Sequence, residues 1–261
     1  MKLSVSTLGL PGVGLDGAIE VATKHGCQGL ELRLHPDTGV HVGLSADERA
    51  EVRRKVEAAN LEISALAGYV RVCEPGDDAE KIEALTQELR LAGDLGAPGV
   101  RVFPRGDDPA VGARRLKAVA GTARELGVRV LVETHDLMAT GQAVAGLLEA
   151  AGEPDTTGAL WDLLHPWRHD ESPARTLEAL APYLAYVQVK DAVSAHDTTP
   201  VPMGSGSVPL DECGELLRAA GYDGWVSLEW ERTWYPHVAP VDEILPGAAA
   251  WVSRYAPKET A

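Results

Sequence analysis

The sequence repeats one pattern along its whole length: a short apolar run without polar alternation, then a stretch with helical spacing. Short uninterrupted runs of this kind are typical of parallel strands that are buried on both faces. The runs that we interpret as strands are residues 3–7, 29–33, 61–67, 98–103, 128–133, 158–162, 184–190 and 225–230. Because each run is followed by a helical stretch, the pattern predicts parallel strands joined by crossover helices.

Capping and stop signals delimit these helices. Ser45 and Glu48 have the spacing of a capping box, and Gly96 and Gly127 end two helical stretches. The predicted helices cover approximately residues 15–25, 46–60, 78–95, 108–127, 140–152, 172–180, 210–220 and 241–255.

Eight strand–helix units in 261 residues match the count and size of a closed barrel. No linker, low-complexity run or abrupt charge block divides the units. We therefore predict an α/β fold, a single (β/α)8 TIM barrel domain spanning residues 1–261. A doubly wound open sheet is the alternative, but it usually has fewer strands, and no Gly-x-Gly-x-x-Gly turn follows the first strand.

Composition narrows the environment and the partners of this chain. The net charge is −15, from 39 acidic and 24 basic residues, which disfavours binding to nucleic acid. No apolar run is long enough to span a membrane, and the N-terminus has no signal-peptide core. Cys27, Cys73 and Cys213 lie far apart, which indicates buried thiols in a reducing, cytoplasmic setting. We expect a small-molecule substrate, and apolar helix faces are compatible with a homo-oligomer.

Four successive predicted strands end in side chains that could bind a metal ion: Glu133, Asp162, Gln188 and Glu229. The carboxyl ends of barrel strands converge on one face, where the active sites of this fold lie. Three carboxylates brought together there repel one another unless a cation lies among them. An oxygen-rich set without a thiolate suits Mn²⁺ or Mg²⁺, with Zn²⁺ or Co²⁺ also possible. The alternative is that each acid pairs separately with a loop arginine.

Three further polar residues lie close after these strand ends. His135 lies two residues after Glu133, and so faces the same side if the strand continues. Lys190 has the same relation to Gln188, and its alternative is a surface ion pair with Asp191. His165 comes after the sixth strand and is either a substrate contact or an exposed loop histidine. We predict that His135, His165 and Lys190 bind substrate.

Tryptophans cluster around the sixth and eighth strands. Sugars present apolar C–H faces that pack on aromatic rings, so the cluster suits a sugar or polyol. Core packing is the favoured interpretation for Trp161 and Trp230. Trp167 and Trp234 fall in predicted loops, and we predict that they contact substrate.

Other features carry weaker signals. Arg33, Arg101 and Arg105 could bind polyol or anionic groups, but surface salt bridges are the favoured interpretation for each. The turn at residues 203–206 could wrap a phosphate, although a plain turn is favoured. The sequence has no Gly-x-Ser-x-Gly elbow, no Walker loop and no His-Glu-x-x-His motif.

Several of these segments together resemble the xylose isomerase-like TIM barrels, the sugar phosphate isomerase/epimerase superfamily. The resemblance spans the whole chain and is most specific in its second half. The matching segments are Leu-Val-Glu-Thr-His at 131–135, Trp-Asp-Leu-Leu-His at 161–165, Val-Gln-Val-Lys-Asp at 187–191, Gly-x-Gly at 204–206 and Tyr-Asp-Gly-Trp-Val-Ser-Leu-Glu at 222–229. One departure is Gln188, where the family usually has a histidine ligand; a glutamine oxygen favours Mn²⁺ or Mg²⁺ over Zn²⁺.

The resemblance implies a metal-dependent isomerase or epimerase that acts on a ketose-type substrate through an enediolate. Glu133 and Glu229 would be metal ligands and the acid/base pair, on opposite faces of the substrate. His165 and Lys190 would hold hydroxyl groups and the developing oxyanion.

Three alternatives remain open at the level of sequence. The first is a dehydratase of an inosose- or dehydroshikimate-like ketone on the same scaffold. The second is an endonuclease of the same superfamily; His35 and His41 are present for additional metals, but the charge of −15 opposes it. The third is a polyol-binding protein that has lost its metal, which the retention of Glu133, Asp162 and Glu229 together argues against.

Overall fold

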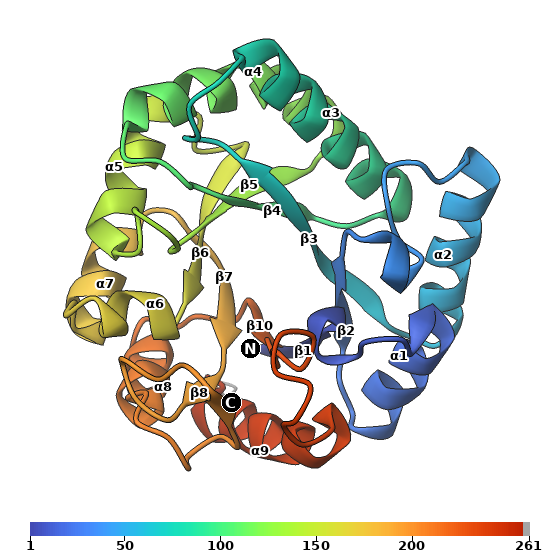
Figure 1. The fold of residues 1–261 in the computed structure, drawn as a ribbon, viewed down its shortest axis with the longest axis vertical. Helices are drawn as coiled ribbons and strands as arrows, with labels where there is room; N and C mark the ends of the chain where they lie inside the picture. Colours follow the sequence, from blue (N-terminus) through green and yellow to red (C-terminus); the bar gives the residue numbers. More distant parts are fainter. Residues whose placement is uncertain (258–261) are drawn as a thin grey trace.

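A computed structural model describes residues 1–257 of the chain; the end of the expected domain, residues 258–261, lies outside the described part. Eight parallel strands close into a barrel in the order β1-β10-β7-β6-β5-β4-β3-β2, and Figure 1 looks along its axis. The barrel strands are β1 (Lys2–Ser6), β2 (Gly29–Arg33), β3 (Glu62–Arg71), β4 (Gly99–Phe103), β5 (Arg129–Glu133), β6 (Thr157–Asp162), β7 (Leu184–Val189) and β10 (Trp225–Leu228).

Helices surround the barrel and cover the outer face of its sheet (Figure 1). The longer helices are α1 (Gly14–Lys24), α2 (Ala46–Ala58), α3 (Asp78–Leu95), α4 (Pro109–Leu126), α5 (Gly141–Ala151), α7 (Pro173–Leu180), α8 (Leu210–Ala219) and α9 (Val241–Tyr255). The predicted (β/α)8 TIM barrel is therefore confirmed, as is the capping box of Ser45 and Glu48 on α2.

Besides shifts of one or two residues at several strand ends, three details differ from the sequence prediction. β3 runs to Arg71 rather than to residue 67, after an irregularity in its pairing with β4. The segment after β6, predicted as a loop, contains the short helix α6 (Leu164–Arg168), and the loop after β7 contains the small antiparallel pair β8 (Asp191–Ala192) and β9 (Pro200–Val201). Elements this short have too few residues to show a periodicity.

Alternation along the strands separates two cores. Residues such as Val130 and Val132 pack in the large core that lies between sheet and helices. A second, small cluster fills the barrel itself and consists of Ala65, Leu131, Leu160 and Tyr186. Because successive strand residues point to opposite faces, the residues two positions further along also face the barrel interior. On β5, β6 and β7 these residues are Glu133, Asp162 and Gln188.

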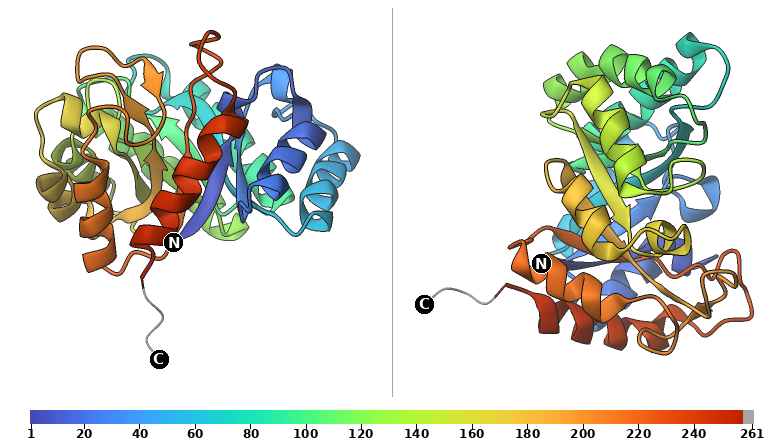
Figure 2. Two further views of the ribbon diagram at one scale, coloured as in Figure 1. Left: turned by 90° about the horizontal axis from the view of Figure 1, so that it is seen from below. Right: turned by 90° about the vertical axis from the view of Figure 1, so that its left-hand side faces the viewer.

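The loops after the strands gather at one end of the barrel. Figure 2 shows the loops after β7 and β10 rising at the end away from the N-terminus. The three cysteines are free and buried, as predicted. Within residues 1–257, the helices are all too short or too polar to cross a bilayer. The polar strand ends therefore open toward the loop-bearing mouth of the barrel.

Candidate metal and substrate site

A lysine ammonium lies among three carboxylates at the mouth of the barrel. The Nζ atom of Lys190 is 2.8 Å from Asp162 Oδ2, 2.5 Å from Glu229 Oε2 and 2.6 Å from Glu231 Oε1. Lys190 is 3% exposed, so these contacts are shielded from water. The expectation of a surface pair with Asp191 is wrong, because alternation on β7 places Lys190 on the same inner face as Gln188.

The side-chain amide of Gln188 contacts this group through Glu229 and links it to Glu31. Its Nε2 donates to both carboxylate oxygens of Glu31, at 3.1 Å each, and to Glu229 Oε1 at 3.2 Å. Gln188 and Asp162 are directly paired neighbours on β7 and β6, which places their side chains at one level of the barrel. The four predicted ligand residues thus lie together at the carboxyl ends of β5, β6, β7 and β10.

An arginine balances the remaining acid. Arg101 Nε lies 3.3 Å from Glu133 Oε2, and both side chains are buried. Its Nε and Nη1 atoms are buried without a hydrogen-bond partner. The favoured prediction of a surface salt bridge is wrong for Arg101 and for Arg33, which is 4% exposed. The prediction of a surface salt bridge is confirmed for Arg105, whose side chain is half exposed and lies 3.7 Å from Asp136.

Two histidines lie next to Glu133. The ring centroids of His135 and His165 are 4.3 Å apart, and His165 Nε2 is 3.9 Å from Glu133 Oε1 and 3.6 Å from Asp162 Oδ2. One potential ligand atom from each of Glu133, His135 and His165 lies within 4.8 Å of the other two. These histidines, predicted as substrate contacts, therefore also offer ligand atoms to a cation. His165 lies on α6 rather than in an open loop.

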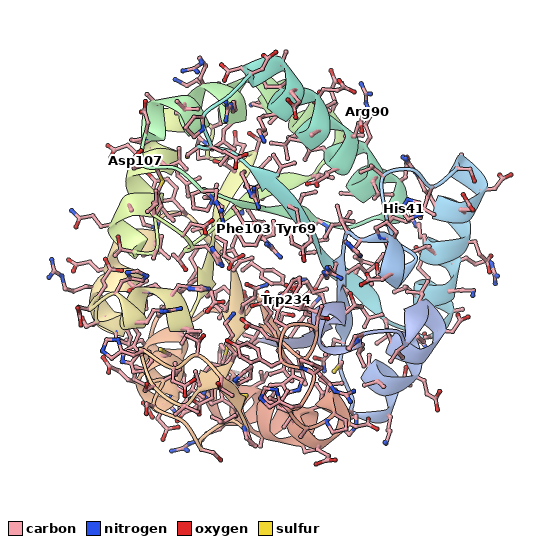
Figure 3. The ribbon with its side chains drawn as sticks, in the orientation of Figure 1. His41, Tyr69, Arg90, Phe103, Asp107 and Trp234 are labelled. Atoms are coloured by element: carbon pink, nitrogen blue, oxygen red, sulfur yellow. The ribbon has the colours of Figure 1, made fainter. Side chains whose placement is uncertain are left out.

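Aromatic rings and guanidinium groups alternate across the mouth. Arg33 lies over the rings of Trp234 and Tyr69, at 5.3 and 5.5 Å from their centroids. Arg101 lies over Tyr69 and over Phe103, at 5.5 and 4.0 Å. Figure 3 shows Tyr69, Phe103 and Trp234 near the centre of the view along the barrel axis, away from the peripheral helices.

The acidic groups titrate differently because their neighbours differ. Burial raises the pKa of Glu133 to about 8, although the charge of Arg101 opposes the shift. Burial also acts on Glu229, but the charges of Lys190 and Arg101 outweigh it, so its pKa falls below the usual value. Burial lowers the pKa of His165 well below its usual value, and Lys190 adds to the effect.

The donor set fits a divalent cation of the hard class. Gln188 Oε1 is buried without a hydrogen-bond partner, and Glu133 Oε2 and Asp162 Oδ2 meet Arg101 and Lys190 only as ion pairs. Unpartnered buried acceptors are costly, and oxygen atoms in this number suit Mn²⁺ or Mg²⁺. For Glu133, Asp162, Gln188 and Glu229 to hold such an ion, the Lys190 ammonium must withdraw toward Glu231.

The two tryptophans that were predicted to contact substrate lie in different surroundings. Trp234 is 54% exposed and lies at the mouth, as expected of a substrate contact. Trp167 lies on α6 and packs partly buried against the outer core. Trp161 and Trp230 are core residues, as favoured from the sequence.

The backbone N–H groups of the glycines in the turn at 203–206 find their hydrogen-bond acceptor within the chain. The N–H groups of Gly204 and Gly206 both donate to Asp191 Oδ2 at 2.9 Å. A Cβ on Gly206 would collide with Asp191 and with the carbonyl of Ala192. The turn is therefore a structural one, and these amides are not free for a phosphate.

Sequence reasoning missed Glu31, Tyr69 and Phe103. The signal for Glu31 was present, because an acid between Leu30 and Leu32 in a buried strand must face the inside of a barrel. Tyr69 was missed because β3 was predicted to end at residue 67. No local pattern marks Phe103, whose ring meets Tyr69 and His135 from outside its own strand as well as Arg101 within it.

Comparison with known proteins places this site in a family. The model of the xylose isomerase-like TIM barrel family matches residues 19–255. The chain belongs to the xylose isomerase-like TIM barrel family. The expected resemblance is thereby confirmed.

Individual relatives differ in their reactions. A putative hydroxypyruvate isomerase of Streptomyces coelicolor is 28% identical over 196 residues, which cover 67% of this chain and 68% of that protein. The solved structure of the probable 3-DHS dehydratase AsbF from Bacillus anthracis superposes with a TM-score of 0.79 at 23% identity, covering 97% of this chain and 99% of AsbF.

Two other solved structures are similar in fold. D-psicose 3-epimerase, solved in the presence of D-fructose, has a TM-score of 0.77 at 16% identity, with 99% of this chain and 100% of that chain covered. The IOLI protein with a bound zinc atom has a TM-score of 0.81 at 18% identity, with 98% and 99% covered. Proteins that share this fold thus include an epimerase and a probable dehydratase.

Proposed function

We propose that this protein is a metal-dependent isomerase or epimerase of a sugar or related polyol with a ketose-type carbonyl. One observation carries the proposal: the polar ends of β5, β6, β7 and β10 bring Glu133, Asp162, Gln188 and Glu229 to one buried site in which oxygen atoms lack hydrogen-bond partners. A divalent cation there, Mn²⁺ in the first instance, would polarise the substrate carbonyl and stabilise the negative charge of an enediolate.

Glu133 and Glu229 would act on opposite faces of the substrate. Glu133 ends β5 and Glu229 comes directly after β10, and β6 and β7 separate these strands in the barrel. One carboxylate removes the proton from the carbon next to the carbonyl. The other, as a carboxylic acid, returns a proton to the opposite face or to the neighbouring carbon, which gives epimerisation or isomerisation.

The remaining residues orient the substrate. With its ammonium withdrawn toward Glu231, Lys190 would donate hydrogen bonds to the carbonyl or hydroxyl oxygens of the substrate. His135 and His165 lie against Glu133 and can hold a neighbouring hydroxyl. Trp234 at the mouth offers an aromatic face to the C–H groups of a polyol.

The second candidate is a dehydratase of an inosose- or dehydroshikimate-like ketone. His135 beside Glu133 favours it: although burial opposes the shift, the charges of Glu133 and Asp136 raise the pKa of this imidazole, and its imidazolium could protonate a β-hydroxyl as it leaves. The two candidates share proton removal next to the carbonyl. They differ in the fate of the resulting enediolate, which is reprotonated in one case and expels the β-hydroxyl in the other.

Solvent-hydrogen exchange tests both. The Mn²⁺-loaded protein is incubated with a panel of ketoses in D₂O, and C–H loss is monitored by NMR while enone formation is monitored by ultraviolet absorbance. We expect exchange without enone, and a loss of at least about hundredfold in Glu229→Gln. Glu62→Gln is the matched control, because Glu62 is exposed at the start of β3, away from the site. This variant should catalyse hydrogen exchange at the wild-type rate. Enone formation would select the dehydratase; no exchange with any substrate would contradict both.

A further inference from the structure

We propose that Glu31 is a positioning residue that fixes the amide of Gln188 so that the carbonyl oxygen faces the metal ion. This inference rests on the proposed metal site and assigns its geometry to a residue outside the four ligands. Glu31 comes from β2, which β1 and β10 separate from β7 in the barrel, so the contact crosses the interior.

The chemistry of the contact decides which end of the amide faces Glu31. The same amide atom of Gln188 lies within 3.2 Å of Glu31 Oε1, Glu31 Oε2 and Glu229 Oε1. The carboxylate of Glu229 accepts from the Lys190 ammonium through Oε2 and faces Gln188 with Oε1. An amide oxygen facing carboxylate oxygens would be repelled, whereas the NH₂ group donates to them. This end is therefore the nitrogen.

With the amide nitrogen facing Glu31, the amide oxygen of Gln188 is available to another partner. Gln188 is fully buried, and its Oε1 has no hydrogen-bond partner. A cation bound to Glu133, Asp162 and Glu229 supplies one. If the amide rotated by half a turn, it would present NH₂ protons to the cation and lose a ligand. Glu31 prevents this rotation, in the way that carboxylates orient ligating histidines from behind.

The contact between Glu31 and Gln188 explains how a glutamine can serve as a ligand at the end of β7. An imidazole can coordinate with one nitrogen and donate with the other, whereas an amide does both only in one of its two orientations. With Glu31 selecting that orientation, the four ligands are all oxygen atoms. The set then favours Mn²⁺ or Mg²⁺ over metal ions that prefer softer ligands.

The test is Mn²⁺ affinity, measured by titration calorimetry on the dialysed protein without substrate. Glu31→Leu, which removes the acceptor, should raise the Kd for Mn²⁺ by about tenfold to hundredfold. Glu31→Gln retains an acceptor oxygen and should stay within about fivefold of wild type. Glu62→Leu removes an exposed carboxylate at the start of β3, where it pairs with Lys2 away from Gln188, and should leave the Kd unchanged.

A double-mutant cycle separates orientation from charge. In Gln188→Met the amide is absent, so adding Glu31→Leu should have no further effect on Kd. The exchanged pair, Glu31→Gln with Gln188→Glu, keeps an amide–carboxylate hydrogen bond and should bind Mn²⁺ at least as tightly as Gln188→Glu alone. The exchanged pair also covers the case in which Glu31→Leu does not fold.

The outcomes distinguish this inference from the proposed function. Wild-type affinity in Glu31→Leu, equal weakening in Glu31→Gln and Glu31→Leu, or an exchanged pair that binds more weakly than Gln188→Glu would overturn the role of Glu31 alone. A wild-type protein that binds no Mn²⁺ would overturn the proposed metal site together with it.

Discussion

Lys190 shows how one side chain controls the charge of the site. Its ammonium contacts Asp162, Glu229 and Glu231 at 2.5 to 2.8 Å, and two of these residues are predicted metal ligands. The ammonium therefore neutralises carboxylate oxygens of the predicted metal ligands Asp162 and Glu229. Metal binding and the contacts of Lys190 with the ligands compete, and the contact with Glu231 gives the ammonium a place to withdraw to.

Replacement of Lys190 by methionine tests this competition. Without the ammonium, buried carboxylates face one another unpaired, so the metal-free protein should lose about 3–5 kcal/mol of stability. Added Mn²⁺ should then raise the Tm of Lys190→Met by more than it raises that of wild type. Thermal unfolding with and without Mn²⁺ measures both effects, and Lys55→Met, at an exposed pair with Asp16, is the control. A smaller shift with Mn²⁺ in Lys190→Met than in wild type would refute competition.

Elements outside the site hold its walls in place. Helix α3 carries Glu88, whose carboxylate lies against Gly68 and the backbone N–H of Tyr69 on β3. Burial raises the pKa of Glu88 to about 7. The acid therefore stays protonated in the folded protein at a pH where the unfolded chain has already released the proton.

Protonation of Glu88 makes the stability of the folded protein depend on pH. Between about pH 4.5 and pH 7 the folded state binds more protons at Glu88 than the unfolded state, so stability falls as pH rises. Relative to Glu88→Gln, wild type should lose at most about 3 kcal/mol across this window and change little above it. Urea unfolding of both proteins at pH 5 and pH 8 measures the difference. A constant difference between the two proteins would show that Glu88 titrates normally.

The loop after β7 depends on Asp191 in a similar way. Its carboxylate accepts from the N–H groups of Ala192, Gly204, Gly206 and Val208 at 2.9 to 3.2 Å. Removing it leaves several backbone donors without a partner at the edge of the site.

Asp191→Ala should therefore loosen this loop more than the rest of the barrel. We expect a stability loss of about 2–3 kcal/mol, because hydrogen bonds to a charged acceptor are lost. Limited proteolysis should cut within residues 203–208 faster than in wild type. Asp197→Ala, at an exposed turn of the same loop, is the control. Equal cleavage in Asp191→Ala and wild type would contradict the role of Asp191.

At the scale of the whole molecule, the sequence was sufficient for the barrel and for the ends of its later strands. Buried parallel strands such as β5 and β7 lack alternation, and glycines end many helices, so each unit is visible locally. Glu133, Asp162, Gln188 and Glu229 were recognisable because a polar residue that ends an apolar run must lie at the carboxyl end of the barrel.

The missing part of the prediction concerns contacts between distant strands. Glu31 meets Gln188 across 157 positions of sequence, and Arg33 and Arg101 share the ring of Tyr69. Neither contact has a local signature, because register and barrel closure bring these residues together. The burial of both arginines was mispredicted for the same reason.

The central claim is that the strand ends form one site for a divalent ion. Metal analysis after dialysis against Mn²⁺ tests it most directly, on wild type, Glu229→Gln and the control Glu62→Gln. We predict about one equivalent of Mn²⁺ per chain in wild type and Glu62→Gln, and none in Glu229→Gln. No bound ion in wild type, or an equal amount in Glu229→Gln, would contradict the claim and leave a barrel without metal-assisted enediolate chemistry.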